Sequence, residues 1–145
     1  MKLSTKSRYG LRILIQIAVD SEIMPAVKGK VVAQQQNISE AYLEQIMIPL
    51  KNSGMVGTVR GCNGGYVLNK KTEDINLLEI IEIFEGKVQL VRCVGKKNEC
   101  KRSEACTAST VWWHLSEVIR KEASLIKLSE LVEKEKKINK MDYVI

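Results

Sequence analysis

Three cysteines, Cys93, Cys100 and Cys106, lie within fourteen residues in a polar stretch of this chain. Thiolates are metal ligands and nucleophiles, so thiolates this close in sequence can converge on one centre. Their gaps of six and five residues are wider than the two-residue gaps usual in compact zinc sites. The spacing favours an iron–sulfur cluster under a looped chain. It leaves open zinc or another metal, and thiol redox chemistry without a bound centre.

A fourth ligand for such a cluster is missing from the obvious places. Iron–sulfur clusters are normally held by four protein ligands, usually thiolates. The one histidine, His114, stands eight residues beyond Cys106. On a helix this separation is about 12 Å, which is too far for easy binding of the same centre.

The first half of the chain carries all of the excess positive charge. Residues 1–72 hold ten Lys and Arg and four Asp and Glu, a net charge of +6, whereas residues 73–145 hold thirteen of each sign. Such an asymmetry is typical of a domain that binds a polyanion. Charge alone does not distinguish DNA from RNA or an acidic protein, and a basic surface that serves only solubility is the alternative.

The first predicted element is an amphipathic helix over about residues 4–20, where apolar residues recur at helical spacing. Basic residues crowd the start of this helix, although the helix dipole favours acidic side chains there. Phosphates bound at that end would compensate the unfavourable charge.

A helix-turn-helix is predicted from the next elements. A short helix over about residues 30–36 is followed by a turn at Asn37, and Ser39 is a good N-cap for a third helix over about residues 40–53. Pro49 is expected to kink the third helix or to end its hydrogen bonding early. Two short helices joined by a tight turn are typical of DNA-binding proteins, and a simple helical hairpin is the alternative.

A glycine-rich hairpin is predicted after the third helix. Its strands cover residues 55–60 and 66–68, and residues 61–65 form the turn. A helix-turn-helix followed by such a hairpin is a winged helix, in which Arg60 ends the first strand. Cys62 at the tip is expected only to fill a hairpin position, with an oxidisable thiol near DNA as the alternative. An ordinary surface hairpin is the alternative for the wing.

The second half combines helices with the cysteine segment, residues 87–106. Asn76 is predicted to cap a short apolar helix over residues 77–85. A long helix is expected over residues 107–123 and a further short helix over residues 125–137.

The long helix has an apolar stripe that needs a partner, and we expect the same helix of a second subunit to cover it. Packing against its own domain is the alternative. The sequence thus predicts a winged helix-turn-helix DNA-binding domain over residues 1–72. Residues 73–145 are predicted to form an effector and dimerisation region.

Length and composition exclude several other classes of protein. The chain has 145 residues, of which 45% are hydrophobic and 28% charged, enough for one core or a small domain with an oligomerisation arm. No apolar run approaches the ~20 residues of a membrane span, and the N-terminus lacks the apolar core of a signal peptide. We therefore expect a cytoplasmic protein with no membrane partner. The chain has no Cys-x-x-Cys motif and no Ser/His/Asp constellation, so we do not expect an enzyme.

In the order of its elements and in several motifs, nearly the whole chain resembles the IscR/NsrR/CymR family of bacterial winged-helix transcription regulators. The motifs are, in order, Met1-Lys2-Leu3-Ser4-Thr5-Lys6 with Arg8-Tyr9-Gly10-Leu11, Ile38-Ser39 with Tyr42-Leu43-Glu44-Gln45, Arg60-Gly61 with Gly64-Gly65-Tyr66, and the three cysteines followed by Val111-Trp112. The resemblance implies a mainly α fold with a small β-hairpin wing. It also implies a homodimer of paired winged helices, with a cluster loop beside the long dimerisation helix.

On this resemblance the third helix enters the major groove of a double-stranded operator. Gln45 is suited to adenine, Glu44 to a cytosine amino group, and Arg60 to a narrow minor groove. The alternative for Tyr42 is core packing against the first helix. The alternative for Glu44 and Gln45 is that both are solvated surface residues without a role in DNA binding. The expected DNA contacts are Lys2, Ser4, Thr5, Lys6, Arg8, Tyr9, Ser39, Glu40, Tyr42, Glu44, Gln45, Lys51, Arg60, Asn63 and Gly64.

The resemblance also implies that Cys93, Cys100 and Cys106 hold the cluster, [2Fe–2S] rather than [4Fe–4S], which need not survive purification. Ser109 stands where iron–sulfur members can carry a histidine, and Arg8 where some use an aspartate of the partner subunit, so the fourth ligand is unknown. Cluster gain, loss or oxidation would change the spacing of the two winged helices. The alternative is a cluster-free repressor, controlled by thiol oxidation or by a partner protein such as an enzyme of cysteine synthesis.

Overall fold

The computed structural model describes residues 1–94, 100, 102 and 105–143. Within these residues the chain forms six α-helices, one short 3-10 helix and a two-stranded antiparallel sheet. The predicted mainly α fold with a small β-hairpin is therefore confirmed. The elements are α1 (Thr5–Asp20), α2 (Gly29–Gln36), α3 (Glu40–Asn52), β1 (Val56–Val59), β2 (Gly65–Leu68), η1 (Thr72–Asp74), α4 (Leu77–Glu85), α5 (Thr107–Leu125) and α6 (Leu128–Asp142).

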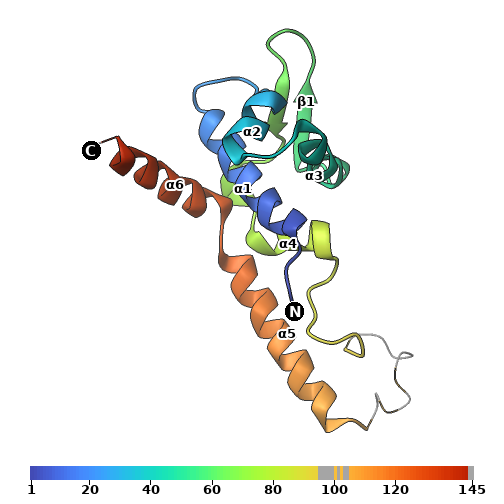
Figure 1. The fold of residues 1–145 in the computed structure, drawn as a ribbon. Coiled ribbons are helices and arrows are strands. Elements are labelled where there is room, and N and C mark those ends of the chain that lie inside the picture. The colour runs from blue at the N-terminus through green and yellow to red at the C-terminus, as the bar shows by residue number, and fades with distance from the viewer. Residues whose placement is uncertain (95–99, 101, 103–104, 144–145) are drawn as a thin grey trace.

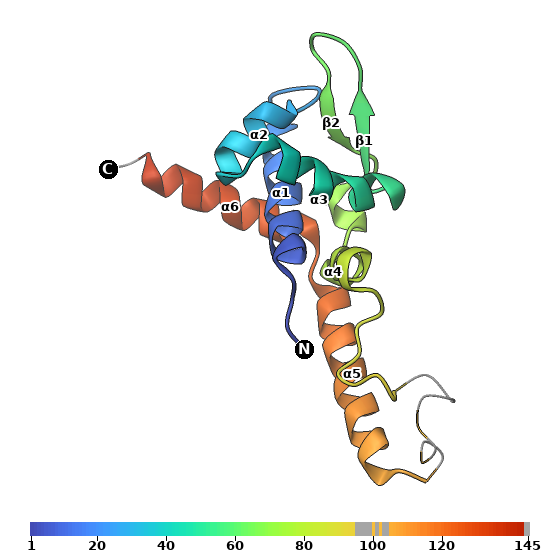
Figure 2. The same cartoon turned by 45° about the vertical axis from the view of Figure 1, so that its right-hand side comes forward.

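The molecule has a compact end and a projecting end. Helices α1 to α3 and the hairpin gather at the compact end, and α5 projects away from them (Figure 1). Helix α4 lies between α1 and α5, while α6 turns back and crosses α1, against which it packs (Figure 2). Residues 87–94, the first part of the cysteine segment, run from α4 to the side of α5, at the end of the molecule away from the hairpin (Figure 1).

The helix-turn-helix forms because local side chains satisfy the helix ends. Asn37 adopts a left-handed conformation with φ 54°, and the N–H of Ile38 donates to the carbonyl of Ala33 at 3.0 Å, which closes α2. The Ser39 hydroxyl then accepts from the N–H of Tyr42 at 3.1 Å and begins α3. Helix α3 continues through Pro49 to Asn52, so the proline does not end the helix, and a kink at Pro49 stays a prediction.

The wing is a four-residue pairing of β1 with β2, from Val56 opposite Leu68 to Val59 opposite Gly65. Its turn requires a glycine at position 64, because a Cβ atom on Gly64 would collide with the carbonyl oxygen of Val59. Both strands were predicted, with β1 shorter by a residue at each end. A helix-turn-helix followed directly by this hairpin confirms the predicted winged helix.

One hydrophobic core joins the two halves of the chain. It combines Leu14 of α1 and Leu43 of α3 with Ile80 of α4 and Leu128 and Val132 of α6. Packing therefore continues across residue 72. The division into a DNA-binding domain before this residue and an effector and dimerisation region after it stays a prediction about function.

The C-terminal helices differ from their predicted bounds. Helix α5 runs on to Leu125, and α6 begins at Leu128 and ends at Asp142. The two residues between them are extended because the Ile126 carbonyl accepts from Leu77 N–H and the Leu128 N–H donates to the Ile75 carbonyl, both at 2.9 Å. In the part of the chain described here, no helix is long and apolar enough to cross a membrane.

Candidate nucleic-acid interface and cysteine segment

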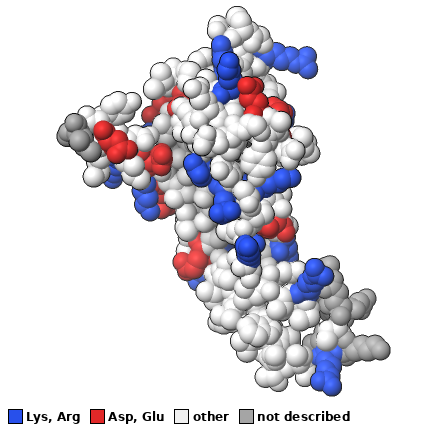
Figure 3. Space-filling view, viewed as in Figure 1, with Lys and Arg blue, Asp and Glu red and all other residues white. Residues whose placement is uncertain are grey.

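The predicted DNA-contact residues lie at the start of α1, along α3 and at the tip of the wing. Lys and Arg side chains appear on one face from the hairpin end across the winged helix to the lower end of the molecule (Figure 3). Arg60 and Asn63 are exposed in the hairpin loop, which projects away from the core (Figure 1). Cys62 is exposed in the same loop, as predicted for a wing-tip position.

The first turn of α3 presents exposed polar residues, and Tyr42 links it to α1. Ser39 and Glu40 are exposed. The ring of Tyr42 is half-buried and meets the ring of Tyr9 edge to face, with centroids 5.9 Å apart. Arg12 covers the Tyr9 ring at 5.1 Å from its guanidinium carbon. Packing against α1, the alternative for Tyr42, is therefore observed, and contact with DNA stays a prediction.

Glu44 is exposed, and protein groups lie against both of its oxygens. The Tyr66 hydroxyl donates to Oε1 of Glu44, and the Lys51 ammonium lies 3.8 Å from Oε2. Burial, and then the hydrogen bond and negative charge of Glu44, raise the pKa of Tyr66 well above its ordinary value. The phenol therefore stays protonated and remains a donor at neutral pH.

The start of α1 receives its negative charge from α4. Helix α1 has no acidic residue in its first turn, but the carboxylate of Glu85 accepts from the Ser4 N–H at 2.8 Å and from the Ser7 hydroxyl. Hydrogen bonds from Ser4 and then Ser7 hold the pKa of Glu85 below its ordinary value. The Ser4 hydroxyl itself caps the helix by accepting from Ser7 N–H at 3.1 Å. Glu85 thus supplies part of the compensating negative charge, and compensation by bound phosphates stays a prediction.

The remaining predicted residues at and before the start of α1 are exposed. Lys2, Thr5 and Arg8 are exposed, and Arg8 Nη2 donates to Thr5 Oγ1 at 3.3 Å. Positively charged side chains near the helix start thus remain accessible to phosphates, and Ser4 and Tyr9 are engaged within the protein.

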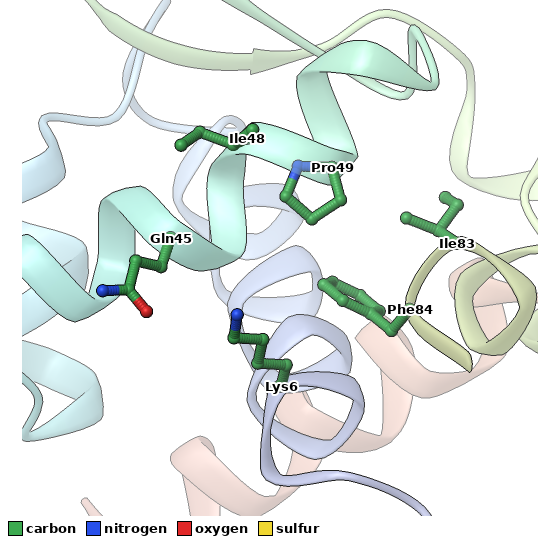
Figure 4. Close-up of a pocket in the computed structure, with 6 residues that line it drawn as sticks. All are labelled: Lys6, Gln45, Ile48, Pro49, Ile83 and Phe84. Atoms are coloured by element: carbon green, nitrogen blue, oxygen red, sulfur yellow. The ribbon is translucent and has the colours of Figure 1, made fainter. Parts of the chain in front are cut away.

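Two predicted DNA contacts from different helices meet at one shallow pocket. Lys6 of α1 and Gln45 of α3 line an open hollow of about 400 Å³ between α1, α3 and α4 (Figure 4). Its other lining residues are apolar: Ile48, Pro49, Ile83 and Phe84. The Lys6 side chain extends toward α3 (Figure 4), so the structure brings its charge to the side of α3 that carries Gln45.

The three cysteines of the cysteine segment are free and partly exposed. Residues 95–99, 101, 103 and 104 lie outside the described residues. Among those that are described, no three His, Cys, Asp or Glu side chains gather closely enough to hold a metal ion. The donors are of the right type for iron–sulfur chemistry, but in this arrangement they do not form a ligand set. Ser109 is engaged locally, since its hydroxyl donates to the Cys106 carbonyl at 2.7 Å.

The beginning of the cysteine segment is fastened to both neighbouring helices. The Val88 N–H donates to Glu82 of α4 at 3.1 Å, and the Leu90 N–H donates to the Ser116 hydroxyl of α5 at 3.0 Å. Glu82 also pairs with Arg120 of α5. A change in this segment can therefore act on α4 and α5 together.

The apolar stripe of α5 is exposed. Val111, Leu115 and Val118 recur at helical spacing and are each between 41% and 50% exposed, whereas Ser116 and Ala123 on another side of the helix are buried. Among the described residues, nothing covers these three side chains fully, which favours a partner over packing against their own domain.

Two contacts within the candidate interface were not predicted from the sequence, because they join residues far apart in the chain. Tyr66 meets Glu44 across 22 positions, and Glu85 meets Ser4 across 81. The one sequence feature that singled out Tyr66 was its place directly after the two glycines of the hairpin. No sequence feature indicated the contact of Glu85 with Ser4. The contact of Arg12 with the Tyr9 ring was not predicted either, although Arg12 lies one turn after Arg8 on α1.

Comparison with known proteins identifies the family. The family Rrf2, described as "Iron-dependent Transcriptional regulator", matches residues 3–134. The chain is 35% identical over 132 residues to the HTH-type transcriptional regulator IscR of Klebsiella pneumoniae, covering 91% of this chain and 80% of the relative. It is 42% identical over 102 residues to the HTH-type transcriptional regulator CymR of Bacillus subtilis, covering 70% and 73%.

A solved structure agrees with these relatives. The structure of CymR, the global cysteine regulator of B. subtilis, superposes with a TM-score of 0.75 at 31% identity and covers 92% of this chain and 98% of that one. The names of these relatives are those of transcriptional regulators, which agrees with a chain that is not an enzyme. The predicted resemblance is confirmed, and the chain belongs to the Rrf2 family of transcriptional regulators, with IscR and CymR among its relatives.

Proposed function

We propose that this protein is a homodimeric regulator that binds a double-stranded DNA operator in a sequence-specific way. The observation that carries this proposal is the winged helix, whose α3 start, wing loop and α1 start all expose polar or basic residues. In this role α3 enters the major groove, and basic residues around it hold phosphates. The basic excess of residues 1–72 supports the same partner.

Dimerisation is proposed to occur through α5. Its exposed apolar stripe lies on a helix that projects from the compact end of the molecule (Figure 1). A second copy of the same helix would cover this stripe and place two winged helices on two half-sites of one operator.

Arg60→Ala is expected to weaken binding to the operator by about 1–3 kcal/mol, because the wing would lose its contact with the minor groove. The operator is first selected with the wild-type protein from random duplexes, and affinity is then measured by fluorescence anisotropy. Arg92→Ala is the matched control, since Arg92 is an exposed arginine of the cysteine segment. An unchanged affinity of Arg60→Ala would remove the wing from the interface.

The same titrations repeated over a range of salt concentrations test the phosphate contacts. Each phosphate neutralised by Lys or Arg steepens the fall of affinity with salt. A binding constant that hardly depends on salt would contradict a DNA interface built from basic side chains.

We further propose that the cysteine segment makes DNA binding respond to iron–sulfur or redox state. The family description "Iron-dependent" and the three thiols next to α5 support this response. The contacts of Val88 and Leu90 with α4 and α5 give it a route to the proposed dimer helix. In this role the three thiols act either as ligands of an iron–sulfur cluster or as redox-active groups without a bound centre.

Iron and sulfide analysis after anaerobic reconstitution distinguishes the two forms of this response. In the cluster form, the protein binds iron and sulfide, and Cys93→Ala, Cys100→Ala and Cys106→Ala abolish the visible absorbance. In the cluster-free form, a repressor controlled by thiol oxidation or by a partner protein, the protein stays colourless. In both forms we expect the triple variant to bind operator equally with and without oxidant, and a retained response would exclude these thiols as the sensor.

A further inference from the structure

Tyr66 lies at the base of the wing and is held from several sides. It is 5% exposed and pairs with Thr58 across the hairpin. Its backbone also exchanges two hydrogen bonds with Val27, at 2.8 and 2.9 Å. Its ring lies so close to α2 that a Cβ atom on Gly29 would come within 3.1 Å of it. The ring therefore has little room to turn aside.

The one polar group of this fixed ring is directed at the recognition helix. The Tyr66 hydroxyl donates to Oε1 of Glu44 on α3. Glu44 is otherwise on the outside of the molecule, with 57% of its side chain exposed. Lys51, seven residues later and thus on the same face of α3, lies 3.8 Å from Oε2 of Glu44. The Lys51 ammonium also lies 5.9 Å from the centroid of the Tyr66 ring.

We propose that Tyr66 is a positioning residue that sets sequence specificity, because its hydroxyl holds the Glu44 carboxylate in one orientation on the DNA-facing side of α3. This role rests on the proposed DNA-binding function. When Lys51 turns to a phosphate, it releases Oε2 of Glu44, and the buried phenol remains as the fixed partner of the carboxylate. The wing thus acts on base recognition through α3, in addition to the contacts made by its own loop.

Loss of the Tyr66 hydroxyl is expected to reduce discrimination between operator sequences more than affinity for the preferred operator. A carboxylate held in one place accepts a hydrogen bond from a base that offers an amino group, and it repels a base edge that offers only acceptors. Without the hydrogen bond from Tyr66, the carboxylate can rotate into water, where it neither stabilises the complex with the correct base nor destabilises the complex with a wrong one. The hydroxyl of Tyr66 therefore contributes chiefly to the difference between operator sequences.

Tyr66→Phe tests this role, since it removes the hydroxyl and keeps the packed ring. The dissociation constant is measured for the operator selected with wild-type protein and for every single-base-pair substitution within one half-site. We expect the affinity for the selected operator to stay within about threefold. At one base pair the preference over its substitutes should fall by roughly tenfold. Tyr143→Phe is the matched control, because Tyr143 is 92% exposed and its hydroxyl should not affect the preference.

A double-variant cycle separates positioning from a general structural effect. In the Glu44→Ala background, Tyr66→Phe is expected to leave base preference unchanged, because no carboxylate remains to be positioned. Full wild-type preference in Tyr66→Phe, or an equal loss of affinity for every duplex, would overturn the role. A further loss of preference in the Glu44→Ala background would overturn it too. A wild-type protein that selects no preferred duplex would instead overturn the DNA-binding function on which the role rests.

Discussion

Replacement of Leu115 by glutamate is expected to convert the protein from a dimer to a monomer and to lower its operator affinity by about a hundredfold or more. Leu115 lies in the middle of the exposed stripe of α5, between Val111 and Val118. In a symmetric dimer each change occurs twice, so two unpaired carboxylates would enter one apolar interface, at a cost of several kcal/mol. A monomer would then hold only one half-site.

The measurement combines analytical ultracentrifugation with titration of the selected operator. Ser124→Glu is the control, because Ser124 lies nine residues after Leu115, two and a half turns along α5, and therefore on the opposite side of the helix from the stripe. The control is expected to remain a dimer with nearly wild-type affinity. A dimer that survives Leu115→Glu would move the interface away from this stripe, and a monomer with full operator affinity would show that dimerisation does not support DNA binding.

Leu128→Ala is expected to reduce the free energy of unfolding by about 2–5 kcal/mol. Leu128 begins α6, is fully buried, and packs in the same core as α1 and α3. Removal of its side chain should therefore destabilise the winged helix together with the C-terminal helix, in a single cooperative transition.

Chemical denaturation followed by circular dichroism provides the free energy of unfolding for this test. Leu125→Ala is the matched control, because Leu125 is three residues away in the chain and 59% exposed, and its loss should cost much less. Equal effects of the two substitutions would contradict a shared core. Two separate transitions would show that residues 73–145 unfold independently of the DNA-binding half.

Most helix boundaries could be predicted, because the signals that end a helix are local. Ser39 and Asn76 accept hydrogen bonds from N–H groups three residues ahead, so short polar residues before apolar runs identify the helix starts. Gly86 ends α4 with φ 75°, a conformation that glycine adopts easily. The break between α5 and α6 was misplaced because it depends on pairing of residues 126–128 with residues 75–77, some fifty positions away.

The types of residue at the candidate interface were also predictable, but their partners were not. Basic residues at the start of α1, polar residues at the start of α3 and Arg60 on the wing follow from the order of elements and the spacing of side chains. The sequence contained no sign that Glu85 would supply the missing acid at α1, or that Tyr66 and Lys51 would hold Glu44. The three cysteines were recognised as one group, but their described positions do not bring them together.

The winged helix, the exposed stripe of α5 and the family therefore follow from the order of the amino acids. Apolar periodicity and capping act over a few residues, and short motifs can be read in the chain without knowing what they touch. Folding itself settles which polar groups remain free for DNA, because a side chain's availability depends on neighbours brought from distant positions. Ser4 and Tyr66 are engaged within the protein, whereas Arg60 and Lys2 are exposed. Long-range packing thus separates candidate DNA contacts from residues that hold the interface in shape.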